Sequence, residues 1–579
     1  MSALTVPFLM PRVEEVVPDF AMLKDRLTGA SVIEERYTAT QVPSSGDSYT
    51  VGGSGAKLMI IRVANQNDYI DTSTMVLQLY AKAVYNSTPA STLPNSAIDD
   101  HIFSCVDTIN VKVGGQTVEV LNNVGHLMNA LVQGSMPATY YQQNGAFEGL
   151  YIYDKTSQSK GVPAIMSGTA FDGTAVVTPT LFTAITSAGS PTTQIEAAMD
   201  VVPGSGPDVS GSQALRSKWN VGNQWLTNGR YYTIPLTLLG LCRIPTLFAA
   251  RNFQDVTIEI LFKSSIASAI WGLNPNGTSS TGTPPPTVAQ VVDTGSIAIS
   301  DVSLTYDCCR MSADYYALMD NELKMPNGSG VAYPIDTYQV QPASISSGAA
   351  GTSGTGVAVS SLATPGLTRI VVAKGTRFLK SVYGVTKPTL SENSVIFRNN
   401  SQSGNFGFNS YQVIINSKRY PQLQIQSSAM AFQELQKAYN QLGSIAGGSL
   451  TNWNNYVGQP VNRLVLGAAL TNASRQDLTI SGTKDGTTLG AFPGDEAMFQ
   501  VGVNLEQFLT SQPDAGGINT STSGYQIAIE LAQLGIVAEP QTTFLAQTGF
   551  VGPASLTHYV ILHFTRVLTL KAGAVEILD

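Results

Sequence analysis

The sequence predicts an all-β chain that folds as two tandem sandwiches, because it carries many strand patterns, an internal repeat and little charge. Runs rich in β-branched residues, or alternating apolar and polar, occur at 57–63, 75–84, 109–121, 297–306, 378–385, 410–425, 497–505 and 558–570. Only 12% of the residues are charged, whereas roughly 25% is usual. Stretches rich in Gly, Ser and Thr at 155–222, 264–296 and 344–366 are expected to be long loop insertions between strands.

Helical periodicity is confined to short pieces. Apolar residues three and four apart predict one helix that starts near Val124 and another that starts near Phe432. Each is followed by a Gly-Ser pair, at Gly134 and Gly443, where we expect the helix to stop. A third helix is expected at 312–323.

The strongest element of the repeat is a hairpin followed by a helix. The segment 111–118 turns at Gly114-Gly115, and the segment 413–420 turns at Asn416-Ser417, with no gap between the two patterns. Gly and Asn tolerate the positive φ of a two-residue hairpin turn. The repeat resumes further on, where 234–236 aligns with 503–505 and 256–260 aligns with 527–531.

The repeat and the length divide the chain. A chain of 579 residues exceeds what one hydrophobic core usually supports. Two nearly all-β copies fit eight-stranded jelly rolls. We therefore expect an N-terminal arm at 1–49, a first jelly roll at 50–307, a linker with a short helix at 308–333 and a second jelly roll at 334–579.

The segment 231–261 has an unusual composition. A strand ends at Ile234-Pro235-Leu236, an apolar crossover through Cys242-Arg243 follows, and a second strand covers 256–260. Such an apolar connection would be an aggregation hazard if exposed. We therefore expect Leu241, Ile244, Leu247 and Phe248 to be buried.

This segment resembles the signature of double jelly-roll major capsid proteins of large eukaryotic DNA viruses and their smaller relatives. The junction is similar too: strand 297–306, helix 312–323 and then the strand 333–341. The stretch 409–416, followed by Arg419-Tyr420-Pro421, looks like a hairpin of virophage and Polinton-like virus capsid proteins. The crossover lacks the aromatic pair that large viruses usually have before Cys-Arg, so the resemblance favours the Polinton-like or virophage lineage.

The resemblance implies a structural role and no enzymatic activity. A member of this family would form homotrimeric, pseudo-hexameric capsomers that tile an icosahedral virion shell, after synthesis in the cytoplasm of the host cell. Its partners would be other copies of itself, with minor capsid and penton proteins. The alternative is a carbohydrate-binding or adhesion protein, since lectins share the jelly-roll architecture.

The residues themselves offer no chemistry. We find no phosphate loop and no nucleophile elbow, and we assign no catalytic, cofactor-binding or metal-binding residue. His558 and His563 are five positions apart on a strand, so they point to opposite faces and are not a metal pair. The acidic pairs at 99–100 and 495–496 are expected to be solvated, and Asp255 and Glu259 to face away from the core.

Charge and cysteine content exclude further classes. The net charge is −8 and Lys and Arg are scattered, so we expect no direct binding of nucleic acid. The four cysteines, Cys105, Cys242, Cys308 and Cys309, make no disulfide framework and indicate a reducing compartment. No apolar run reaches the roughly 18 residues of a membrane span, so no transmembrane segment is expected.

Overall fold

The computed structural model describes most of the strand-forming sequence. The described residues are 33–63, 67–85, 95–98, 101–136, 229–244, 246–253, 256–266, 269–273, 294–313, 315–317, 331–345, 366–372, 374–388, 408–441, 499–506, 517–521, 526–533, 556–571 and 574–578, with 148, 320, 403, 451, 456, 483–484 and 487–488 as isolated pieces.

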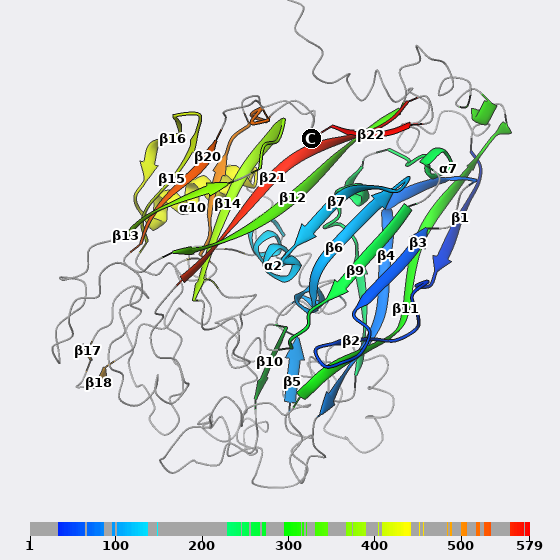
Figure 1. Cartoon of the computed structure of the whole chain (residues 1–579), viewed down its shortest axis with the longest axis horizontal. Helices are drawn as coiled ribbons and strands as arrows, with labels where there is room; N and C mark the ends of the chain where they lie inside the picture. The colour runs from blue at the N-terminus through cyan, green and yellow to red at the C-terminus, as the bar shows by residue number, and fades with distance from the viewer. Residues whose placement is uncertain are drawn as a thin grey trace, which may run out of the picture.

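The first half of the chain forms two antiparallel sheets (Figure 1). One sheet has the order β1 (Ile33–Gln41), β11 (Thr294–Met311), β4 (Tyr69–Tyr85) and β8 (Arg230–Pro235), and β2 (Tyr49–Val51) also pairs with β11. The other sheet has the order β3 (Leu58–Val63), β9 (Val256–Phe262), β6 (Val106–Val113) and β7 (Gln116–Asn122). Because β1 and β2 pair with successive parts of β11, each sheet has four strand positions.

The second half repeats this arrangement. One sheet has the order β12 (Val331–Ile345), β21 (Leu556–Lys571), β14 (Phe378–Pro388) and β19 (Val501–Asn504), and β22 (Ala574–Leu578) extends the position of β14 along β21. The other has the order β13 (Gly366–Val372), β20 (Ile527–Gln533), β15 (Phe408–Ile415) and β16 (Lys418–Ile425). The predicted all-β fold with eight strand positions in each half is confirmed.

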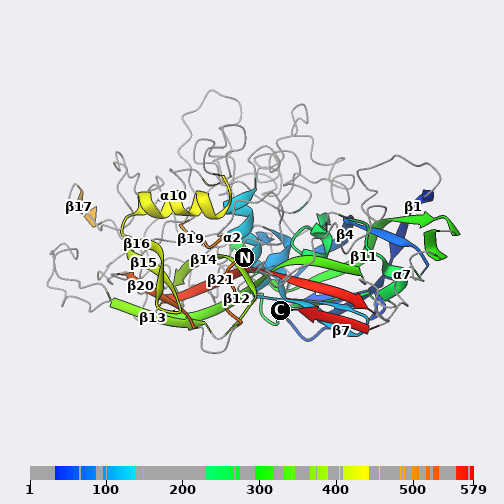
Figure 2. The ribbon, with the colours of Figure 1, turned by 90° about the horizontal axis from the view of Figure 1, so that it is seen from above.

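Smaller elements lie between these strands. Two short ribbons pair β5 (Asn95–Ile98) with β10 (Ile270–Leu273) and β17 (Thr483–Lys484) with β18 (Thr487–Thr488). The helical pieces are η1 (Ile102–Cys105), α2 (Val124–Ser135), η2 (Gly240–Arg243), α7 (Ala250–Phe253) and α10 (Ser428–Ala438). Seen from above, α2 and α10 lie on the same side of the sheets (Figure 2).

The hairpins and helices of the repeat occur as predicted, with one correction. Both turns have positive φ, at Gly114 (56°) and Gly115 (77°) and at Asn416 (47°) and Ser417 (66°). Helix α2 ends at the Gly134-Ser135 pair as predicted, although Gly134 does not take the left-handed conformation. The stop of the other helix differs, because α10 already ends at Ala438 and Asn440 takes the left-handed conformation. Gly443 lies outside the described residues.

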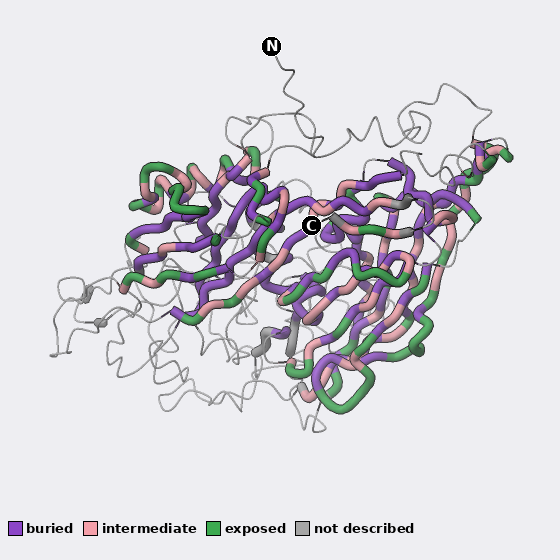
Figure 3. The backbone as a smooth tube through the Cα atoms, turned by 45° about the horizontal axis from the view of Figure 1, so that its top comes forward, coloured by how far each residue is buried: buried purple, intermediate pink, exposed green. Residues whose placement is uncertain are grey.

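The core of each half lies between its two sheets, where buried and exposed positions alternate along many strands (Figure 3). The crossover is buried as expected, with Leu241, Ile244, Leu247 and Phe248 at most 2% exposed. Part of its cover comes from the other half, because the ring of Phe248 lies 5.1 Å from that of Tyr333 in β12. The crossover therefore belongs to a contact between the two halves.

Strands extend into the segments that were expected to be the arm and the linker. Residues 33–41, inside the predicted arm, form β1. This strand pairs with the C-terminal part of β11 and so belongs to a sheet of the first half. The predicted linker begins inside β11, includes helical residues at 313 and 315–317, and ends inside β12. Within the described residues, every sheet takes its strands from one half alone.

Candidate functional site

The junction between the halves contains a fully buried carboxylate, Glu119 in β7. Its Oε1 and Oε2 accept hydrogen bonds from the backbone N–H of Gly240 in η2, at 3.1 and 3.0 Å. Oε1 also accepts one from the Thr337 hydroxyl in β12, at 2.7 Å. Burial raises the pKa of Glu119, although Thr337, Arg243 and Gly240 oppose that shift. One side chain thus ties together two segments of the first half and one of the second.

Arg243 makes the reciprocal contact from the crossover. Its Nη1 donates to the Tyr338 hydroxyl at 3.0 Å, and its Nη2 donates to the backbone carbonyl of Asp336. The guanidinium carbon also lies 5.0 Å from the centre of the Tyr338 ring. A planar fork with several donors suits such a contact better than the point charge of a lysine. The predicted Cys-Arg motif therefore contributes its arginine to the junction.

Asp336 supports this contact from inside the second half. Its Oδ1 accepts hydrogen bonds from Lys380 Nζ at 2.7 Å and from the Thr565 hydroxyl at 2.6 Å. Burial acts to raise the pKa of Asp336, but the positive charge of Lys380 and these hydrogen bonds outweigh it and hold the pKa below its usual value. The carboxylate is therefore charged at neutral pH.

Further contacts cross the junction. Tyr333 accepts a hydrogen bond from the Ala249 N–H at 3.0 Å and donates one to the Leu247 carbonyl at 3.2 Å. Arg566 in β21 donates to the Val118 carbonyl at 2.7 Å. The rings of His126 in α2 and Tyr559 in β21 lie 4.3 Å apart. Side chains of β12 and β21 thus pack against the edge strand β7, the crossover and α2 of the first half.

The pairing register identifies the matching place in the first half. Strands β8 and β19 align in the repeat, and from each the pairing runs through the next two strands to β1 or β12. The equivalent rows are Ile234–Leu77–Leu304–Gln41 in the first half and Val503–Val382–Leu562–Gln339 in the second. Gln41 in β1 therefore corresponds to Gln339 in β12.

Three positions before these glutamines, both halves have the same hydrogen bond with its residues exchanged. In the first half the Thr38 hydroxyl of β1 donates to Asp307 of β11 at 2.8 Å. In the second half the Thr565 hydroxyl of β21 donates to Asp336 of β12 at 2.6 Å. A cation accompanies each carboxylate, Arg36 in the first half and Lys380 in the second. This shared arrangement adds structural support to the repeat seen in the sequence.

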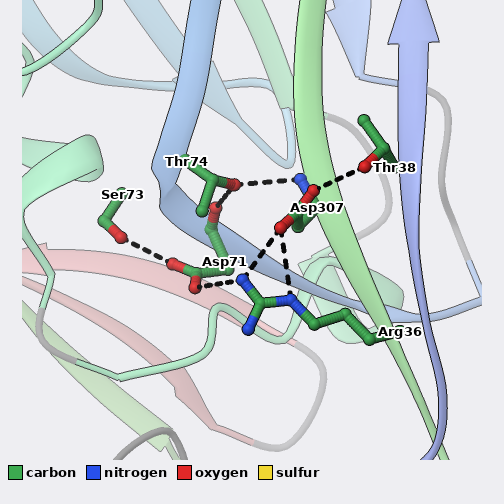
Figure 4. Close-up of polar contacts among 6 residues, drawn as sticks. All are labelled: Arg36, Thr38, Asp71, Ser73, Thr74 and Asp307. Carbon is green, nitrogen blue, oxygen red and sulfur yellow. Dashed lines mark hydrogen bonds and ion pairs between the residues drawn. The ribbon is translucent and has the colours of Figure 1, made fainter.

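Figure 4 shows the first-half cluster. Arg36 lies between two carboxylates, with Nη2 2.8 Å from Asp307 and 3.5 Å from Asp71. The Thr74 hydroxyl accepts a hydrogen bond from the Asp307 N–H, and the Ser73 hydroxyl donates to Asp71. Unlike its counterpart at the junction, this cluster is open, since the Arg36 side chain is 55% exposed.

The described histidines and cysteines have packing roles. His558 is buried and His563 half-buried, beside the hydroxyls of Thr386 and Ser381 at 2.9 and 3.2 Å. All four cysteines are free and buried, and burial raises the pKa of Cys105 to about 12. Across the part of the chain that the structure describes, no group of three or more His, Cys, Asp or Glu residues could hold a metal ion.

The acidic residues named in the sequence are only partly described by the structure. Glu259 points away from the core and accepts a hydrogen bond from Lys112 at 2.6 Å, as expected. Asp255 and the acidic pairs at 99–100 and 495–496 lie outside the described residues. None of the described helices is long and apolar enough to cross a membrane.

Sequence reasoning missed Glu119, Asp336 and Thr337. One signal was available, because Glu119 interrupts the apolar run from Val118 to Leu121 in an edge strand of the repeat. An acidic residue at such a position is costly to bury without partners.

Comparisons with known proteins agree with this architecture. No family model matches the chain, and no curated protein matches its sequence. The Faustovirus major capsid protein is similar in structure over 93% of this chain and 90% of its own, at 9% sequence identity and a TM-score of 0.50. The chain has the double jelly-roll fold. The two jelly rolls are the two halves described above, and the junction joins them.

Other solved structures show likeness over similar lengths. The PBCV-1 protein VP54, fitted into a reconstruction of the virophage Sputnik, covers 94% of this chain and 96% of its own, at 9% identity and a TM-score of 0.49. The Sputnik virophage structure covers 95% and 89%, at 10% identity and a TM-score of 0.46.

Proposed function

We propose that this double jelly-roll protein is a major capsid protein whose homotrimers tile an icosahedral virion shell. The observation that carries the proposal is the repeated architecture of the two rolls, held at a polar junction that includes Glu119 and Arg243. Two similar rolls in one chain give six similar units in a trimer. Closed cyclic symmetry is a usual route to stable oligomers.

The same proposal includes the expected limits and partners. The arm, the two rolls and the linker would follow the predicted limits 1–49, 50–307, 308–333 and 334–579, with β1 of the arm region added to the first sheet. The partners would be other copies of the chain, and minor capsid and penton proteins, in the virion. With a net charge of −8, direct contact with the genome is not part of the proposal.

The test begins with the purified full-length chain. Light scattering coupled to size-exclusion chromatography is expected to give three times the mass of the 61.3 kDa chain. Negative-stain electron microscopy should show particles with a six-sided outline. A monomer at micromolar concentration would overturn the proposal, and so would a monomer that binds immobilised glycans, which would favour the adhesion alternative.

A further inference from the structure

We propose that the first-roll face around Arg36, Thr38 and Asp307 is a docking surface for the β15–β16 hairpin of a second copy of this chain. The inference rests on the proposed trimer and deepens it by naming the two surfaces that meet. Its basis is that the junction inside the chain provides a template for the contact between chains.

Inside the chain, the edge strand β7 of the first roll contacts β12 of the second, through Glu119 and Thr337. The register makes β1 the counterpart of β12. These counterparts differ in exposure. From Ala332 to Val340, residues of β12 are buried or half-buried, whereas Glu34, Glu35, Arg36, Thr38 and Thr40 of β1 are all exposed. The face of β1 on the first roll is therefore exposed, whereas the equivalent face of β12 on the second roll is covered by the first roll.

The second surface of the proposed contact is the edge strand β16, which is the counterpart of β7. The hairpins pair equivalently at both ends, with Ile109 opposite Leu121 in one and Tyr411 opposite Ile425 in the other. Leu121 and Ile425 are both fully buried. Between the turn and these residues, β16 is two residues longer than β7 (418–425 against 116–121).

The added length lies in a bulge that exposes an apolar side chain. Leu423 in this bulge is 72% exposed, more than any other large apolar residue that the structure describes as exposed. The bulge begins directly after the counterpart of Glu119, because Val111 pairs with Glu119 in one hairpin and the equivalent Val413 pairs with Tyr420 in the other. An exposed leucine beside the position of a known contact indicates a surface that another chain covers.

Charge also matches across the proposed contact. Lys418 and Arg419 follow the turn of the hairpin and are exposed. Inside the chain, the equivalent turn lies near the end of β21, because a Cβ on Gly114 would be 2.9 Å from Val575 in β22. The corresponding end of the first roll is where β1 begins with the exposed Glu34 and Glu35. Basic residues would thus face acidic ones, although Glu35 also accepts a hydrogen bond from Arg310.

The two surfaces lie at opposite ends of the molecule, with β16 at one end and β1 at the other in both views (Figures 1 and 2). They therefore cannot meet within one chain, and a contact between them joins chains head to tail. Such a head-to-tail contact closes into a ring when the rotations between successive rolls add up to a full turn without a rise along the axis, which is what a closed trimer requires.

Chemical cross-linking of the trimer tests which surfaces meet. Thr40→Cys and Leu423→Cys are combined in one chain and treated with a short bis-maleimide. All four native cysteines are buried, so they should react slowly. We expect covalent dimers and trimers on a denaturing gel. The matched control replaces Leu423→Cys by Leu367→Cys, on β13 and 67% exposed, and should stay uncross-linked.

Charge reversal gives a second readout that misfolding cannot imitate. Glu34→Lys with Glu35→Lys should weaken trimer formation by roughly tenfold or more, because like charges then face one another. Adding Lys418→Glu and Arg419→Glu should restore the trimer. If the wild-type chain is a trimer but the Thr40→Cys, Leu423→Cys variant forms no cross-links between chains, or the second charge reversal restores no trimer, the inference is overturned and the proposed function stands. A monomeric wild-type chain would overturn both.

Discussion

The Glu119 carboxylate of β7 accepts a 2.7 Å hydrogen bond from the Thr337 hydroxyl of β12, across the junction of the two rolls. Both residues are buried, so the bond is shielded from water. It fixes the edge strand of one roll on the first strand of the other. The relative position of the rolls therefore depends on a polar contact as well as on the apolar packing of Phe248 and Tyr333.

The first prediction removes this carboxylate. Glu119→Ala leaves the Gly240 N–H and the Thr337 hydroxyl without their acceptor. Leaving a buried hydrogen-bond donor unsatisfied typically costs about 1–3 kcal/mol. We expect a loss of that size in the free energy of unfolding, measured by urea denaturation.

The matched control is Glu259→Ala on β9, in the same sheet but separated from β7 by β6. Glu259 pairs with Lys112 at the surface, where the Lys112 side chain is 37% exposed. Such pairs contribute about 0–1 kcal/mol. Equal losses in the free energy of unfolding for the two variants would show that the Glu119 contacts stabilise the chain no more than a surface ion pair does.

The sequence predicts the local parts of this structure well and the junction poorly. The turns at Gly114-Gly115 and Asn416-Ser417 were predictable, because positive φ restricts the residues there. The buried crossover was predictable from composition. The contact between Glu119 and Thr337 joins residues 218 positions apart, and no local pattern encodes that pairing. The sequence does not reveal that the Thr38–Asp307 pair matches the Asp336–Thr565 pair, because the threonine and the aspartate are exchanged between the two equivalent strands.

The second prediction concerns acid. Burial lowers the pKa of His558 and of His563 to about 3, whereas an unfolded histidine has a pKa of about 6.5. Between these values the unfolded chain binds more protons than the folded chain. Stability is therefore complete above about pH 6.5 and falls as the pH decreases toward 3, by roughly 1.4 kcal/mol per pH unit for each histidine.

Urea unfolding between pH 4 and pH 7 measures this slope. His558→Asn, which can keep a hydrogen bond to Thr386, should reduce the slope by about one proton. The free energy of unfolding of the variant at pH 7 serves as its own reference. A slope identical to that of the wild type would show that His558 does not stay neutral in the folded chain.

The third prediction concerns the apolar crossover. Phe248 is fully buried and its ring lies 4.9 Å from that of Phe253 and 5.1 Å from that of Tyr333. Truncating a buried phenylalanine costs about 3–5 kcal/mol. Phe248→Ala should lower the yield of folded trimer in size-exclusion chromatography. Leu367→Ala, at a residue that is 67% exposed, should leave the yield unchanged, and the reverse order would contradict the assignment of the core.

The last prediction tests how closely the rolls approach each other. A Cβ added to Gly240 in η2 would overlap the backbone carbonyl oxygen of Asp336 in β12, so only glycine fits between the two rolls here. Backbone atoms cannot move aside as a flexible side chain does. Gly240→Ala must therefore separate η2 from β12, which lengthens the bonds from the Gly240 N–H to Glu119 as well. Overpacking of this kind typically costs about 1–3 kcal/mol. If the cost arises at the junction, Gly240→Ala and Glu119→Ala should be non-additive, because both disrupt one contact. Urea denaturation of the two single variants and the double variant measures this coupling, and full additivity would show that Gly240 acts elsewhere than through Glu119.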